Sequence, residues 1–324
     1  MERRKIAYAT DYAGESTATK EIYQTLKNIA EAGFAYIHWC HEWDGDYMYS
    51  EAEMLQIKGW LKDLGLKCKG VHATEGSRRI QDVPNRFHYR YDLQDRKDYT
   101  SENEYNRQAG VELVRNRLKL AAILGTDAIV LHMQLPYKSF EQEPGFKEKY
   151  YRQVFRSFDE LEEDCKNLGV RICVENMISP PNSYQIEQFD RLFERYDPEV
   201  AAFCFDTGHG MISGDDSLEL LRRYRDRLFM MHVNDNIGIK SEECWENAKE
   251  LAKCDEHRNP FCGRADWEGF AKLVADSPYE LPIVMEVAKR ERPEKEFLQE
   301  SLKNGWKLTE MISQYREKIK REEC

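Results

Sequence analysis

The chain has 324 residues and a formal net charge of −11 at pH 7. This length allows one α/β barrel or two smaller domains, and the acidic balance disfavours nucleic-acid binding, which would need a basic stripe. Nine scattered cysteines without a CxxC pair exclude a disulfide framework and a zinc ribbon. We expect no export signal and no membrane-spanning segment. Together with the unpaired cysteines, this predicts a cytoplasmic protein without a membrane partner.

Short apolar runs alternate with helical patterns along the first half of the chain. We expect strands at residues 5–9, 34–39, 66–72 and 128–132, and helices at 15–32, 51–64 and 105–124, each helix ending at a glycine. The stretch 73–100 carries many charges and tyrosines but few aliphatic residues. We interpret it as an excursion over the mouth of a barrel.

The second half continues this alternation. We expect helices at residues 145–168, 186–196, 218–225 and 267–274, a second long connection at 234–265, and a charged outer helix at 294–320. With four further strands, eight strands alternate with eight helices, which predicts a (β/α)8 TIM barrel. We expect one domain over residues 1–324, with its core at about 4–290 and long loops over the C-terminal face of the strands.

The four later strands share one pattern, because each apolar run stops on a single metal-capable side chain. The runs are Val170 to Glu175, Phe203 to Asp206, Phe229 to His232 and Ile283 to Glu286. A carboxylate or imidazole there is costly to bury unless it is paired or binds a cation. Since the ends of parallel strands share one rim of a barrel, these four side chains predict one metal site.

Side-chain alternation along the strands supports a shared site. The residue two positions before each candidate ligand points the same way as the ligand. These residues are Cys173, Cys204, Met230 and Val284, all apolar. The four polar groups are therefore expected to end inward-facing columns of core residues.

Other histidines and tryptophans near strand ends allow more than one interpretation. His72 and His132 end strands at the same rim, where each could bind substrate, a second metal or a loop carbonyl. Trp39 and Trp43 could form an apolar wall on which a ring of a ligand stacks, or could simply pack. His38 neighbours Trp39, and we expect it to face the helix layer.

These strand ends resemble the xylose isomerase-like barrel superfamily, which includes sugar isomerases, ketose 3-epimerases, inosose dehydratases and apurinic endonucleases. The segments that carry the resemblance are Val174-Glu175-Asn176, Phe205-Asp206-Thr207-Gly208-His209, His232-Val233-Asn234-Asp235, Asp255-Glu256-His257-Arg258-Asn259-Pro260, Gly263-Arg264-Ala265-Asp266-Trp267 and Met285-Glu286-Val287. By matching position, the resemblance implies that Glu175, Asp206, His232 and Glu286 are the metal ligands. It also implies that His209 contacts the substrate.

The loop between the last two strands supplies further candidates. His257 and Arg258 are expected substrate contacts, Asp255 a further metal-capable group, and Asp235 a residue that orients His232 or a loop donor. The epimerase branch has an arginine soon after the strand-seven histidine, where this chain has Ile237, Gly238 and Ile239. Arg258 or Arg264 could take its place. Asp266 is expected to cap the helix that begins at Trp267.

One imidazole and three carboxylates suit one divalent ion, with Mn²⁺ first and Mg²⁺, Co²⁺ or Zn²⁺ as alternatives. Such an ion stabilises the enediolate that forms when a proton leaves the carbon next to a sugar carbonyl. Glu175 and Glu286 are the expected bases, as they are by resemblance to the epimerase branch. We therefore expect an isomerase or epimerase acting on a small-molecule carbohydrate. A homo-oligomer is left open.

Three alternatives remain. A lyase or dehydratase of a keto-sugar or keto-inositol would use the same enolate. The nine residues that resemble the ligands of three-zinc apurinic endonucleases are His72, His132, Glu175, Asp206, His209, His232, Asp255, His257 and Glu286. The acidic balance and the residues flanking His72 and His132 argue against that phosphodiester-cleaving branch. A barrel that only binds sugar fits poorly with a complete ligand set.

Overall fold

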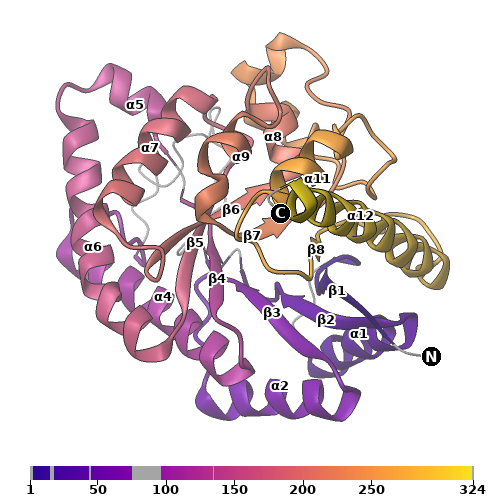
Figure 1. Ribbon diagram of the computed structural model, residues 1–324. Coiled ribbons are helices and arrows are strands. Elements are labelled where there is room, and N and C mark those ends of the chain that lie inside the picture. Colours follow the sequence, from indigo (N-terminus) through magenta and orange to yellow (C-terminus); the bar gives the residue numbers. More distant parts are fainter. Residues whose placement is uncertain (1–2, 15–17, 44, 75–95, 134, 323–324) are drawn as a thin grey trace.

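A computed structural model describes residues 3–14, 18–43, 45–74, 96–133 and 135–322. Eight parallel strands occupy the centre of the molecule and helices surround them (Figure 1). The strands are β1 (Arg4–Ala9), β2 (Phe34–Trp39), β3 (Lys67–His72), β4 (Ala128–Leu131), β5 (Arg171–Glu175), β6 (Ala201–Asp206), β7 (Leu228–His232) and β8 (Val284–Met285). The predicted (β/α)8 TIM barrel is confirmed.

The strands pair in the order β7-β6-β5-β4-β3-β2-β1-β8. The sheet closes between β7 and β8, where the Val233 amide donates to the Val284 carbonyl at 2.8 Å and the Glu286 amide donates to the Val233 carbonyl at 3.1 Å. Because every neighbouring pair is parallel, all strands end at the same rim.

The longer helices follow the strands around the barrel. They are α1 (Thr19–Ala32), α2 (Glu51–Leu64), α4 (Glu104–Leu124), α6 (Phe146–Leu168), α7 (Asn182–Arg195), α11 (Trp267–Ala275) and α12 (Glu294–Glu322). The shorter ones are α5 (Tyr137–Gln142), α8 (Thr207–Ser213), α9 (Glu219–Tyr224), η2 (Arg225–Arg227), η3 (Glu242–Glu246) and α10 (Ala248–Ala252). The expected glycine stops are present; Gly33, for example, ends α1 at φ 107°.

The barrel interior is filled by small and sulfur-containing side chains. Its members are Ala7, Ala128, Val130, Cys173, Ala202, Cys204, Met230 and Val284. The four apolar residues predicted to point inward are all in this cluster, which confirms the alternation argument. β3 contributes Gly70, where an added Cβ would lie 2.5 Å from Met230 Cε, so a larger residue there would displace the end of the Met230 side chain.

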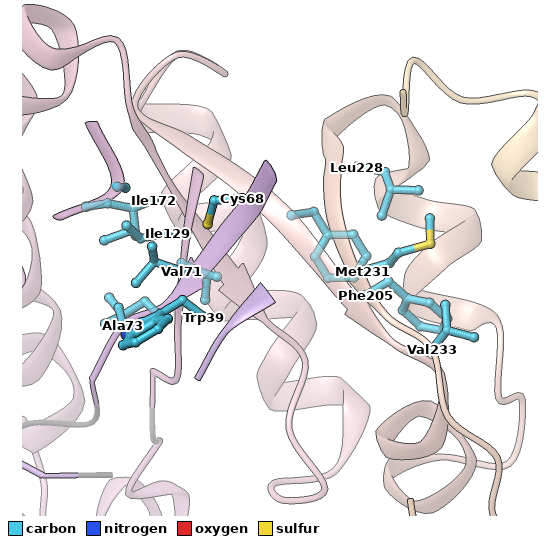
Figure 2. Packing of buried hydrophobic residues seen from close by; sticks show 14 of the residues in the cluster. Trp39, Cys68, Val71, Ala73, Ile129, Ile172, Phe205, Leu228, Met231 and Val233 are labelled. Atoms are coloured by element: carbon cyan, nitrogen blue, oxygen red, sulfur yellow. The ribbon is translucent and has the colours of Figure 1, made fainter. Parts of the chain in front are cut away.

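The opposite faces of the strands pack against the helices in a much larger apolar cluster. Figure 2 shows part of it, with Val71, Ile129 and Ile172 on one side and Phe205 and Met231 on the other. The two clusters together bury both faces of the sheet, as expected for parallel strands.

The final helix does more than present a charged face to solvent. α12 runs beside α11 on the outside of the barrel (Figure 1) and buries Phe297, Leu298, Leu308 and Ile312. The Tyr8 hydroxyl donates to Ser301 Oγ at 3.0 Å, which ties α12 to β1. The predicted outer position is therefore correct, but one face of the helix belongs to the core.

Two further sequence expectations, the excursion after β3 and the absence of a membrane-spanning helix, can be compared only with the described residues. Most of the predicted excursion at 73–100 lies outside the described residues, and only its two ends can be placed. Within the described residues, no helix combines the length and apolar character needed to cross a membrane.

Candidate active site

All eight inward columns end on a polar side chain at the C-terminal rim. In strand order these are Asp11, His38, His72, His132, Glu175, Asp206, His232 and Glu286. The sequence predicts six of them as site residues, because their strands stop directly on the polar group. The rim therefore holds a larger constellation of titratable groups than the four predicted ligands.

Glu175 lies at the centre of this constellation. Its Oε1 is 2.9 Å from His232 Nδ1, and its Oε2 is 3.0 Å from His132 Nε2 and 3.8 Å from His72 Nε2. His232 Nδ1 is also 3.2 Å from Glu286 Oε2. Burial disfavours the charged imidazole, but these two carboxylates outweigh it and raise the pKa of His232 well above its usual range.

Asp206 completes the group of four. It ends β6 and caps α8, with Oδ1 accepting from the His209 amide at 2.7 Å and Oδ2 accepting from Asn234 Nδ2 at 2.7 Å. Burial raises the pKa of Asp206 to about 6, with nearby carboxylates adding to the effect. Donor atoms of Glu175, Asp206, His232 and Glu286 all lie within 4.8 Å of one another, a spacing that would suit a single ion.

A second group lies beside the first. Asp255 Oδ2 is 3.2 Å from His209 Nε2 and 2.9 Å from His257 Nε2, and the three residues form a further metal-capable set. Despite its burial, the two imidazoles hold the pKa of the Asp255 carboxyl well below its usual range. His257 has a φ of 45°, a strained value for a non-glycine residue. Its Nδ1 hydrogen-bonds the Glu286 carbonyl at 3.1 Å.

The rim groups open into a cavity of about 290 Å³. One wall consists of Trp43 with His72 and His132, whose rings lie 4.7 and 5.1 Å from the indole. The remaining lining comes from Asp11, Tyr12, His209, Asp255, His257, Glu286, Val287 and Ala288. Glu286 therefore faces the cavity, whereas Glu175 is fully buried beneath His132.

Three expected site residues lie away from this cavity. Trp39 is 1% exposed, packs on the helix side of β2 near Ala73 (Figure 2), and donates to the Tyr49 hydroxyl at 3.0 Å. Arg258 binds Glu256 instead of lining the cavity. Asp235 accepts from the Gly263 and Ala265 amides and Trp267 Nε1, so it holds the loop and does not contact His232.

The expectation for His38 is wrong. Since Trp39 faces the helices, His38 points into the barrel, where it is fully buried and its Nε2 lies 3.1 Å from His232 Nε2. Burial is the main cause that lowers the pKa of His38 to about 3. The neutral imidazole can thus accept a hydrogen bond from His232, which leaves Nδ1 of His232 for the carboxylates. The expected cap at Asp266 is confirmed by its 2.9 Å bond from the Gly269 amide.

Asp11 is the second rim residue, after His38, that the sequence argument missed. β1 was expected to end at Ala9, and Asp11 lies two positions further along the same inward column. Burial and the charge of Glu286 raise the pKa of Asp11 to about 6. The signal was present in the sequence, because Ala7, Ala9 and Asp11 repeat the pattern of an apolar column that ends on a carboxylate.

Comparison with known proteins places the fold in a family. The family model "Xylose isomerase-like TIM barrel" matches residues 26–306, and the chain belongs to this family. A protein of Sinorhizobium fredii, y4fM, is 31% identical over 265 residues, covering 82% of this chain and 80% of that protein.

More distant matches have functional names. An inosose dehydratase of Lacticaseibacillus casei is 25% identical over 152 residues, and the match spans only 45% of this chain and 50% of that enzyme. The solved structure of a D-tagatose 3-epimerase-like protein matches with a TM-score of 0.65 at 17% identity, covering 98% of this chain and all of that one. At this identity the structural match supports the fold alone.

Proposed function

We propose that this protein is a divalent-metal-dependent isomerase or epimerase that acts on a sugar or related keto-polyol through an enediolate. The observation that carries the proposal is the group formed by Glu175, Asp206, His232 and Glu286, of which Glu286 lines a cavity. The names of the relatives, which include inosose dehydratases, support a substrate of this chemical class.

The residues present fit a divalent cation. Three carboxylates and the His232 imidazole converge within 4.8 Å, and an ion bound there would displace the proton that the carboxylates favour on His232. One imidazole and carboxylate oxygens are donors that Mn²⁺ or Mg²⁺ accepts, and Co²⁺ or Zn²⁺ would also fit. A bound ion supplies Lewis-acid polarisation of the substrate carbonyl and stabilises the charge of the enediolate.

The protein's own groups would move the proton. Glu286 faces the cavity and is the base placed to take a proton from the carbon beside the carbonyl. Glu175 contacts the same nitrogen of His232 as Glu286 does, at 2.9 Å against 3.2 Å, and is the second carboxylate that would return a proton. His132 and His72 contact Glu175 and so limit its rotation.

A dehydratase is the second candidate. It would take the same proton, and the hydroxyl group on the neighbouring carbon would then leave as water with the proton that the base holds, so the same base serves both reactions. The curated relatives named inosose dehydratase favour it. A phosphodiester-cleaving metal cluster is a third possibility, because the His209, Asp255 and His257 group lies beside the first.

Metal content measured on protein purified without added metal or chelator tests the cofactor first. We expect about one Mn or Co per chain. About three Zn per chain would contradict the sugar chemistry and make an abasic DNA duplex the next substrate to assay.

Proton exchange tests the reaction itself. We expect metal-loaded protein to exchange the C–H proton next to the carbonyl of a ketose or keto-inositol with D₂O, seen by NMR, and Glu286→Gln to slow this by about 10²- to 10⁴-fold. Glu280→Gln, an exposed carboxylate just before β8 at the other end of the barrel, is the matched control. A new stereoisomer identifies an epimerase, and loss of water a dehydratase. Equal exchange in the wild type and Glu286→Gln would exclude Glu286 as the base.

A further inference from the structure

Asp11 has no role in the proton transfer described above, although it lines the same cavity. β1 pairs with β8 in the register Ala7 to Val284 and Tyr8 to Met285. Continuing both inward columns brings the end of β1 beside the end of β8, so Asp11 and Glu286 form adjacent parts of the cavity wall.

Three carboxylates line the cavity, and they differ in their hydrogen-bond partners. Asp255 is bonded by His209 and His257, and Glu286 is bonded by His232. For Asp11, the hydrogen bonds to the carboxylate come from its own backbone amide and from the Cys40 thiol, and no imidazole among the described residues bonds it as imidazoles bond the other two. A carboxylate held by such weak donors keeps acceptor capacity that a ligand can use.

The remaining lining limits which ligand that is. Among the described residues that line the cavity there is no Lys or Arg, the side chains that usually hold a phosphate. Arg258, the expected replacement for the missing epimerase arginine, is engaged by Glu256 at 2.5 Å. The volume of about 290 Å³ is at the small end of ligand pockets and suits a single ring or a short open chain.

We propose that Asp11 binds two neighbouring hydroxyl groups of the substrate, and that the substrate is an uncharged keto-polyol and not its phosphate ester. A carboxylate has two acceptor oxygens and no donor, so it complements a pair of O–H groups on adjacent carbons. A phosphate beside Asp11 would add repulsion, and the lining imidazoles whose pKa values are raised, His209 and His257, are both already paired with Asp255. The inference rests on the proposed function and adds the residue that sets substrate specificity.

The test uses the full-length, metal-loaded chain and the ketose or keto-inositol that the wild type converts fastest. Asp11→Asn is compared with the wild type on that compound, on each of its monodeoxy analogues and on its phosphate ester. Asp226→Asn, an exposed carboxylate before β7, is the control. Metal per chain and the melting temperature are measured for every variant.

We expect Asp11→Asn to lower kcat/KM on the parent compound by about 10- to 100-fold, with metal content and melting temperature preserved. On a monodeoxy analogue that lacks a hydroxyl group bound by Asp11, the kcat/KM of Asp11→Asn should be within about threefold of the wild-type value. The wild type should have a higher kcat/KM on the parent compound than on its phosphate ester. The ratio of these two values should be smaller for Asp11→Asn.

Four results would overturn the inference. They are an equal loss on the parent and on every monodeoxy analogue, loss of metal from Asp11→Asn, unchanged kinetics, and a wild-type preference for the phosphate. If the wild type converts no compound of the panel, the proposed function itself fails, and this inference fails with it. That outcome is recognised without any Asp11 variant.

Discussion

Carboxylates have different partners at the rim of the barrel and on its outer surface. At the rim, carboxylates face imidazoles, as at Glu175 and His232. On the outer surface, carboxylates face arginines. Glu104, at the start of α4, accepts from Arg107 Nη2 at 2.7 Å and from Arg156 Nη2 at 2.9 Å. These arginines, with Gln108, lower the pKa of Glu104 to about 2.

This pairing predicts a pH-dependent contribution to stability. A carboxyl whose pKa is lower in the folded than in the unfolded state stabilises the fold above its unfolded value, and the effect is lost as pH falls. We expect Glu104→Gln to melt at a lower temperature than the wild type at pH 7. The difference should close as pH falls from about 4.5 toward 2.

Thermal unfolding between pH 2 and pH 7 checks this prediction. Glu112→Gln, which removes an exposed carboxylate from the same helix, should change the melting temperature less and with little pH dependence. A Glu104→Gln effect of constant size across this range would show that the lost interaction is not one of charge.

The sequence correctly placed a polar residue at the rim where a strand stops directly on it. The prediction failed for His38 because both alternating faces of β2 carry aromatic residues, so that the strand alone does not reveal which face is inside. Pairing with β1 decides it, since Ala9 lies opposite His38. The grouping of Asp255 with His209 came only from resemblance, because it depends on the path of a loop.

The elements of the barrel were predictable to within a few residues at most of their ends, because apolar periodicity and glycine stops mark them. Their contacts with the long connections were not. Gly110 illustrates this, because the backbone at residues 98–99 lies directly on α4 there. A Cβ at Gly110 would be 2.2 Å from the Tyr99 amide nitrogen and 2.6 Å from the Asp98 carbonyl carbon.

Two glycine substitutions test this contact. Gly110→Ala should lower the free energy of unfolding by about 3 kcal/mol, because backbone atoms, which cannot swing aside, occupy the space. Gly59→Ala, within α2 and with no atom within 4 Å of the added Cβ, should raise it by about 0.5–1 kcal/mol through helix propensity. Chemical denaturation of both variants measures the changes. An unchanged free energy of unfolding in Gly110→Ala would show that residues 98–99 do not lie against α4 in solution.

At the scale of the whole molecule, the four proposed ligands join consecutive strands from β5 to β8, including the seam between β7 and β8. An ion that binds the folded barrel and not the unfolded chain stabilises it by mass action. At a free-ion concentration one hundred times the dissociation constant, the gain is about 2.7 kcal/mol. For a chain of this length, that corresponds to a melting temperature about 4 °C higher.

Thermal unfolding with Mn²⁺ and with chelator measures this gain. We expect Mn²⁺ to raise the melting temperature of the wild type but not that of Asp206→Asn, because the carboxylate of Asp206 is one of the four donors. Identical melting temperatures with and without the ion, at concentrations where metal analysis finds it bound, would show that binding is not coupled to folding.

The packed interior of the barrel has a kinetic consequence. Side chains from Ala7 to Val284 fill the space below the rim, and among the described residues they leave no passage to the other end of the barrel. A small molecule bound above Glu175 therefore enters and leaves on the same side. Until a reaction product departs, it blocks the next substrate molecule, so added product should slow the initial rate in the pattern of competitive inhibition.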